Sequence, residues 1–503
     1  MNLDLQRTVL EGYRPVLDTV LTQEETTESI VPDAFPDVSR IICANGSAFL
    51  DRKQAGEGSA RVSGTLRVTV LYVPEGERVP RSLSLNLPFQ CVGDCPQVSE
   101  DSQIHGRVLS VHADARLMNP RKLFLKAEVK LRMTVYSRES QEITCDTVSE
   151  EDGTLQKQTM EYRNFSIAAV MEKPFLFSDS LRQSASKPVM EEVLSWRAEP
   201  GTLDAKYIGK KLVCKGEVQV SVLYRSGEEV IPAQFELPFS QILDLEGGFE
   251  EGEPDVVTVL KSADCRLNEG ELEVAVEALI QATLWAQRKV MVLRDVYSTG
   301  SPLDVERGIG TLCTMAEQDS RRETARKFCE SGIPAKQVLS CTASVGPLNA
   351  QKQEGGMQYS TDAVVEILYL SEDDALCGVS YPVPVCCDIE LPEDCTCVCR
   401  CKPMGDAMAV PVTGGLEVRL EAEFSWHILR MESVSCVSSV CPSAVAQSAE
   451  PKPSVMIRMA GKGETLWDIA KACGATISDI RAANQLTSEE LVPGAVLLIP
   501  THR

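Results

Sequence analysis

The sequence predicts a mainly β protein, in which three tandem β-rich, sandwich-like domains precede a small α+β module with the order strand, helix, helix, strand. Three observations support this prediction. One strand pattern recurs at a domain-sized interval, a long alternating strand closes each repeat, and the last part of the chain switches from strand-like to helix-like periodicity and back. Strands and helices place apolar residues with different periods, so these patterns separate the two kinds of element.

The recurring strand reads GTLRVTVLY at Gly64–Tyr72, GEVQVSVLY at Gly216–Tyr224 and, more loosely, AVVEILY at Ala363–Tyr369. Every second residue is apolar and the residues between them are mostly polar, as in a half-buried β-strand. The repeat period of roughly 150 residues is too long for a solenoid and fits tandem globular domains. Three copies of the strand therefore predict three copies of one domain.

Features on both sides of this strand recur with it. Pro36, Pro188 and Pro334 precede the three copies at nearly equal distances. Long stretches with alternating apolar residues follow, and we expect them to be the closing strands of the units: 123–133, 272–280 and 416–424. The prediction is a string of separate β domains rather than one large core.

These landmarks divide the chain into segments. We expect the three β domains at residues 30–138, 187–300 and 332–431. The segments outside them are predicted to be a helical or irregular lead at 1–29, polar connectors at 139–186 and 301–331, and a flexible linker at 432–455. The linker is rich in Ser, Ala, Val and Pro, a composition that buries too little apolar surface to fold alone.

The C-terminal module is expected at residues 456–501. Thr465 with Asp468, and Thr476 with Asp479, have the spacing of helix-capping boxes. Gly474 stands where a helix ending in a left-handed residue needs glycine. A Pro-Gly pair then predicts a turn before the final strand.

Composition limits the possible functions. The net charge is −23, and an acidic chain is a poor ligand for nucleic acid or an anionic membrane, both of which reward clustered Lys and Arg. No apolar run approaches the ~18 residues of a membrane span. The N-terminal residues lack the pattern of a secretory signal, so we expect a cytoplasmic protein whose 19 cysteines are reduced thiols.

The sequence does not predict an enzyme or a cofactor. The four histidines fall in no metal-binding spacing, and the chain lacks a GxSxG elbow and a phosphate-binding loop. One group of thiols leaves a metal site open: Cys395, Cys397, Cys399 and Cys401. On a strand they would share one face, about 6.7 Å apart, and could recruit Zn²⁺ or cross-link. The preferred interpretation is that they are small apolar strand residues.

Residues 456–500 resemble a LysM module, because KGETLW, IA, AANQL, LVPG and LLIP occur in that family's order and spacing. The resemblance implies a groove for N-acetylglucosamine-containing glycans between the loop after the first strand and the loop before the last. Carried over by position, the residues of this groove, which could bind either glycan or a protein partner, are Gly463, Glu464, Thr465, Leu466, Asn484, Leu486, Leu491, Pro493 and Gly494. The first strand, 457–459, lacks the aromatic residue often found there, which thins the platform that sugars use.

The preceding units resemble the tandem SPOCS domain of clostridial spore-coat proteins in their VPDAFPDV, GxVxVxVLY and Pro-Phe motifs. SPOCS units followed by one LysM module are similar to a family of spore morphogenetic scaffolds. That resemblance implies a protein of the mother cell, acting at the forespore surface. Its LysM module would meet the coat-basement ATPase, of the stage IV sporulation protein A type, and other coat proteins rather than sugar.

The sequence thus favours a non-enzymatic scaffold in spore coat assembly, with a flexibly attached module that adds a second binding contact. Two alternatives remain open. One is a LysM protein that binds peptidoglycan through the same groove, and the other is a wall hydrolase that LysM targets to its substrate.

Overall fold

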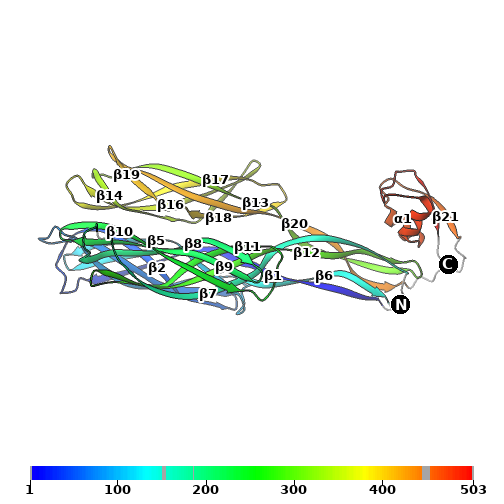
Figure 1. Cartoon of the computed structure of the whole chain (residues 1–503), viewed down its shortest axis with the longest axis horizontal. Coiled ribbons are helices and arrows are strands. Elements are labelled where there is room, and N and C mark those ends of the chain that lie inside the picture. The colour runs from blue at the N-terminus through cyan, green and yellow to red at the C-terminus, as the bar shows by residue number, and fades with distance from the viewer. Residues whose placement is uncertain (1–2, 150–153, 185, 444–453, 501–503) are drawn as a thin grey trace.

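The computed structural model describes residues 3–149, 154–184, 186–443 and 454–500. An elongated β body fills most of the molecule, and a small module with two helices lies at one end of it (Figure 1). The prediction of a mainly β fold with a C-terminal strand, helix, helix, strand module is confirmed.

Each repeat begins and ends with a very long strand, and these two strands pair antiparallel into a ribbon. The three ribbons are β1 (Leu3–Ile30) with β6 (Lys122–Ser149), β7 (Leu155–Leu181) with β12 (Glu271–Ser298), and β13 (Leu303–Glu330) with β20 (Gly415–Pro442). Each pairing runs over almost the full length of both strands. The ribbons are therefore the frame of the β body.

This pairing corrects four predictions. The expected lead at 1–29 is strand β1, and the expected connectors at 139–186 and 301–331 consist largely of β6, β7 and β13. The expected linker at 432–455 begins as the end of β20, while 444–453 lie outside the described residues. These strands carry many charged residues because one side of each ribbon faces water, so the polar composition did not indicate a loop.

Shorter strands complete each unit. In the first they are β2 (Val38–Gly56), β3 (Ser59–Pro74), β4 (Arg81–Asp94) and β5 (Gln103–Asn119). In the second they are β8 (Glu192–Ile208), β9 (Lys211–Ser226), β10 (Glu229–Asp244) and β11 (Gly252–Asn268). The third has β14 (Ala335–Val345), β15 (Asn349–Gln353), β16 (Gly356–Ser371), β17 (Leu376–Glu390), β18 (Cys395–Pro403) and β19 (Met408–Val412).

Two layers enclose the core of each unit. The recurring strand of the sequence is β3, β9 or β16, and it is central in the smaller sheet, with orders β2-β3-β4, β10-β9-β8 and β14-β16-β15, the last with β17 on β16. The other layer is the ribbon with its neighbours. The first two ribbons share a six-stranded sheet, β11-β12-β7-β1-β6-β5. The last tyrosine of each recurring strand, Tyr72, Tyr224 or Tyr369, is at most 1% exposed.

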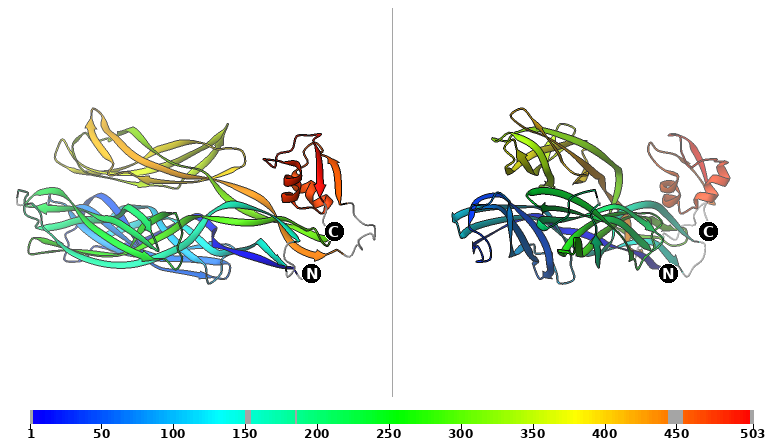
Figure 2. Two further views of the ribbon diagram at one scale, coloured as in Figure 1. Left: turned by 45° about the vertical axis from the view of Figure 1, so that its right-hand side comes forward. Right: turned by 60° about the vertical axis from the view of Figure 1, so that its left-hand side comes forward.

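Beyond the three sandwiches the ribbons continue side by side as a stalk, which we define as residues 3–16 with 136–149, 155–168 with 285–298, and 303–316 with 429–442. Figure 2 shows from two further sides that the ribbons narrow toward the end where the helical module lies. Ile143, Val292, Leu312 and Val434 from the three ribbons form one apolar cluster. The stalk is stable because each ribbon covers the apolar side of the other two.

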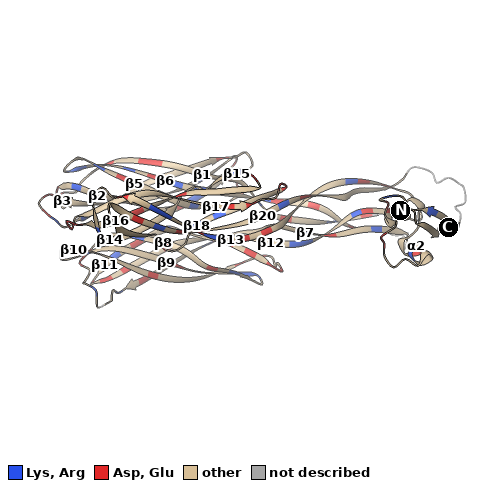
Figure 3. Cartoon of the chain, turned by 90° about the horizontal axis from the view of Figure 1, so that it is seen from above, with Lys and Arg blue, Asp and Glu red and all other residues tan. Residues whose placement is uncertain are grey.

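Acidic and basic residues are interspersed along the strands of the body (Figure 3). Neither helix of the described chain is long and apolar enough to cross a membrane.

A pair of variants tests whether the N-terminal segment is a structural strand. Leu17 is partly buried and packs against the core of the first unit, whereas Val9 on the same strand is 49% exposed. We expect Leu17→Asp to destabilise the protein by about 3 kcal/mol because it places an unpaired charge against an apolar core. Val9→Asp is the matched control. Equal thermal unfolding temperatures for the two variants would contradict the assignment of β1.

Candidate functional site

The helical module is built around a two-stranded sheet. Strands β21 (Val455–Met459) and β22 (Val496–Pro500) pair antiparallel, and helices α1 (Leu466–Cys473) and α2 (Ile477–Asn484) cover one face. Thr465 caps α1 in a complete capping box with Asp468, and Gly474 ends it in the left-handed conformation. The elements therefore form where the capping signals of the sequence placed them.

The two loops predicted to form the groove adjoin each other at Ala460. The backbone N–H of Gly494 donates to the Ala460 carbonyl at 2.8 Å, and the Ala460 N–H donates to the Ala495 carbonyl at 2.9 Å. Gly463 and Gly494 are exposed and have φ of +80° and +87°, which glycine adopts without strain. Pro493 beside them is exposed as well.

Four other predicted groove residues are occupied with holding the module together. Leu466 is 1% exposed within the core. Thr465 caps α1, and Glu464 pairs with Arg458 and accepts from the Gly461 N–H at 3.0 Å. The Asn484 side-chain amide exchanges two hydrogen bonds with the backbone of Leu498, at 2.6 and 2.8 Å.

The remaining two predicted groove residues, Leu486 and Leu491, are half-buried against the module's core. The candidate groove therefore offers a ligand mainly the glycine and proline loop positions together with the edges of two leucines. Whether a ligand binds there stays a prediction.

A second surface of the module did not emerge from the sequence. Five apolar side chains point outward on the sheet face opposite the helices, which we call the hairpin face: Val455 (52% exposed), Ile457 (72%), Met459 (65%), Val496 (61%) and Leu498 (44%). Ile457 lies opposite Leu498, and Met459 opposite Val496. The sequence contained one signal of this face. Apolar residues occupy 455, 457 and 459, and alternate residues of a strand face opposite sides of the sheet, so these three share one face.

The four alternating cysteines of the third unit lie on β18. Cys395, Cys399 and Cys401 are buried in the core of that unit, and Cys397 is partly buried against it. Burial raises the pKa of the Cys401 thiol to about 12 and raises that of Cys399 as well. No group of metal-binding side chains suited to a metal ion occurs among the described residues. Their packing is that of small apolar strand residues.

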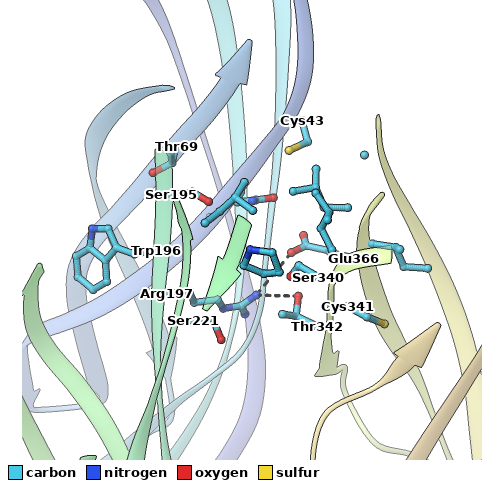
Figure 4. A pocket seen from close by; sticks show the side chains of 18 of the residues that line it. Cys43, Thr69, Ser195, Trp196, Arg197, Ser221, Ser340, Cys341, Thr342 and Glu366 are labelled. Atoms are coloured by element: carbon cyan, nitrogen blue, oxygen red, sulfur yellow. Dashed lines mark hydrogen bonds and ion pairs between the residues drawn. The ribbon is translucent and has the colours of Figure 1, made fainter. Parts of the chain in front are cut away.

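A cavity of about 950 Å³ lies where the three units meet (Figure 4). Side chains from β2, β8, β14 and β16 line it, among them Trp196, Arg197 and Glu366. Arg197 joins two units: it contacts Glu199 at 2.6 Å within its own unit and Glu366 of the third unit at 3.6 Å. It also donates to the Thr342 hydroxyl at 3.4 Å.

The charges at this junction satisfy one another. Burial raises the pKa of the Glu366 carboxyl, and the nearby Arg197 guanidinium opposes that increase. The Arg67 guanidinium from the first unit lies over the rings of Phe49 and Trp196, at 4.9 and 5.0 Å from their centroids. The cavity wall thus contains contacts that hold the three units in one arrangement.

Two segments of the chain match known protein families. Residues 190–268 match the family described as "SipL, SPOCS domain", and residues 461–500 match the LysM domain. No curated protein matches the chain. The predicted combination of a SPOCS-type unit and a C-terminal LysM module is confirmed, and it is similar to that of SipL-type spore proteins. Neither matched family is a family of enzymes.

The junction contacts predict a pH-dependent effect on stability. Arg197→Met leaves the Glu366 carboxylate without its cation. We expect this to lower the free energy of unfolding by about 2 kcal/mol at pH 7, because both side chains are largely buried. Without Arg197 the Glu366 pKa rises further. The cost therefore shrinks as the pH falls toward the ordinary carboxyl pKa of 4.5, where Glu366 is neutral in the folded protein.

Thermal unfolding of the wild type and of Arg197→Met at pH 7 and pH 5 measures this cost. The control is Arg182→Met, which removes an arginine whose side chain is 77% exposed in its pair with Glu271. We expect no change from the control. If Arg197→Met lowered the unfolding temperature by the same amount at pH 7 and pH 5, the loss could not come from the charge of Glu366, and the prediction would be wrong.

Proposed function

We propose that this protein is a non-enzymatic scaffold in spore coat assembly, and that its LysM module binds a protein partner through the hairpin face. The proposed partner is the coat-basement ATPase of the stage IV sporulation protein A type, at the forespore surface of the mother cell. The matched SPOCS and LysM families support a role in spore coat morphogenesis and association with coat proteins.

The observation that carries the proposal is the character of the hairpin face. Its five aliphatic or thioether side chains offer no hydrogen-bonding groups, and the backbone N–H and C=O groups of the two strands lie in the plane of the sheet rather than pointing out of this face. A contiguous exposed apolar patch on a small module is typical of a protein-binding surface. Sugar rings need polar groups beside an apolar platform, and this face has none on its outward side chains.

The glycan alternative keeps one specific support, the adjoining glycine and proline loops of the candidate groove. Backbone groups in such loops recognise sugar without special side chains. The two functions use different surfaces of the same module, so single substitutions separate them.

The test measures binding of the full chain to the purified ATPase and, separately, its retention on insoluble peptidoglycan. Ile457→Glu places a charge in the centre of the hairpin face, and we expect it to weaken ATPase binding about tenfold or more. Ile309→Glu is the control, because Ile309 is an equally exposed isoleucine, at 78%, on the stalk. Both variants should unfold at the wild-type temperature because neither side chain is buried.

Lys462→Glu changes the candidate groove instead, at an exposed loop position that makes none of the structural contacts of Glu464. Wild-type retention on peptidoglycan that Lys462→Glu abolishes and Ile457→Glu preserves would support the glycan function. Absence of ATPase binding, or ATPase binding that Ile457→Glu leaves unchanged, would contradict our proposal. Turnover of peptidoglycan fragments by the wild type would instead support the hydrolase alternative.

A further inference from the structure

The LysM module contacts the β body, because its helix α1 lies against the end of the stalk. The Trp467 indole N–H donates to Asp295 Oδ2 at 2.9 Å, and the Lys471 ammonium donates to both Asp295 carboxylate oxygens at 2.7 and 2.8 Å. The Tyr297 hydroxyl donates to the Ala475 carbonyl at 2.7 Å. Asp295 and Tyr297 both belong to β12 of the stalk.

These contacts combine packing with charge. The Tyr297 ring meets Trp467 edge-on, with 4.9 Å between ring centroids, and Tyr297 is part of the same apolar cluster as the module's own core. Trp467 and Lys471 are four residues apart and so project from one face of α1. A core as small as that of LysM gains one additional aromatic residue from the stalk.

Asp295 is placed to serve as an anchor. Its side chain is 5% exposed, and besides the module it contacts Arg307 of the next ribbon at 3.2 Å. Burial alone would raise its pKa, but the hydrogen bonds from Lys471 and Trp467 outweigh burial and lower the pKa below 3.8. The carboxylate is therefore ionised at neutral pH and matched by cations from both sides.

Comparison of the three ribbons shows that these features are particular to the second unit. Each ribbon has a bulge near its end, at Cys145, Arg294 or Ser438, which aligns Asp146, Asp295 and Ser439. By the same register Tyr297 corresponds to Val148 and Cys441. Asp146 pairs with Lys157 of the stalk and its side chain is 41% exposed, and Ser439 bonds Glu306. Only the second of these three ribbon ends therefore has a buried acid, Asp295, with an aromatic residue, Tyr297, two positions later, and this is the end that the module contacts.

We propose that the end of the second ribbon is a binding surface for helix α1 of this chain's own LysM module, with Asp295 as the anchor. Docking buries Trp467, holds the Lys471 ammonium in its pair with Asp295, and leaves the hairpin face open, since the hairpin face lies across the module from the helices. In Figure 1, β21 lies on the outer side of the module and α1 on the side toward the β body. The proposal does not depend on which partner the hairpin face binds.

The test uses the full chain with a protease recognition sequence inserted within residues 444–453, cut after folding. Gel filtration then shows whether the module stays with the β body. We expect the cut wild type to remain associated, and Asp295→Asn to weaken that association about tenfold or more, because the amide cannot pair with the Lys471 ammonium. Asp146→Asn, at the equivalent position of the first ribbon, is the matched control and should behave as the wild type.

Amine labelling of the uncut chain provides a second measurement. Lys471 should react more slowly than the exposed Lys462 in the wild type and in Asp146→Asn, and the difference should vanish in Asp295→Asn. Separation of the cut wild-type module together with equal labelling of the two lysines would overturn the proposal. Equal effects of the two Asp→Asn variants would overturn it too. Concentration-dependent dimers that Asp295→Asn abolishes would show docking between chains instead, and would overturn the intramolecular form.

Discussion

The structure depends on the pairing of the first long strand of each repeat with its last. Each of these antiparallel ribbons closes a sandwich at one end and continues into the stalk at the other. Since the paired strands lie about a whole domain apart in the sequence, every repeat must be complete before its ribbon forms. The apolar cluster of the stalk contains residues of all three ribbons, so the three repeats pack against one another and are not independent domains joined only by linkers.

The sequence was sufficient for the features that follow a local rule. The recurring strands appear as β3, β9 and β16, and the caps at Thr465 and Thr476 appear at the helix starts. Strands β1 and β13, which open the first and third repeats, were missed. Another ribbon packs against their apolar side, and their other side carries many charged residues that face water. Such a sequence resembles a polar connector until its distant partner strand is known.

The candidate site was predictable in part for the same reason. Loop positions such as Gly463 and Gly494 could be placed by motif, but Leu466 and Asn484 are committed to the module's own structure. The alternation of apolar residues at 455–459 does not by itself identify the hairpin face, and the contact of Trp467 with Asp295 follows from no local pattern. The first requires the side of the sheet that the helices cover, and the second requires the position of the stalk.

In the proposed arrangement, helix α1 of the LysM module lies against the stalk, and the hairpin face on the opposite side is free to bind a protein partner. Hydrogen exchange of the full chain, with and without the coat-basement ATPase, tests this arrangement most directly. The account predicts new protection in β21 and β22, with the exchange of α1 and of 293–298 unchanged. New protection confined to the loops at 461–465 and 491–495, or faster exchange of 293–298 on binding, would contradict it.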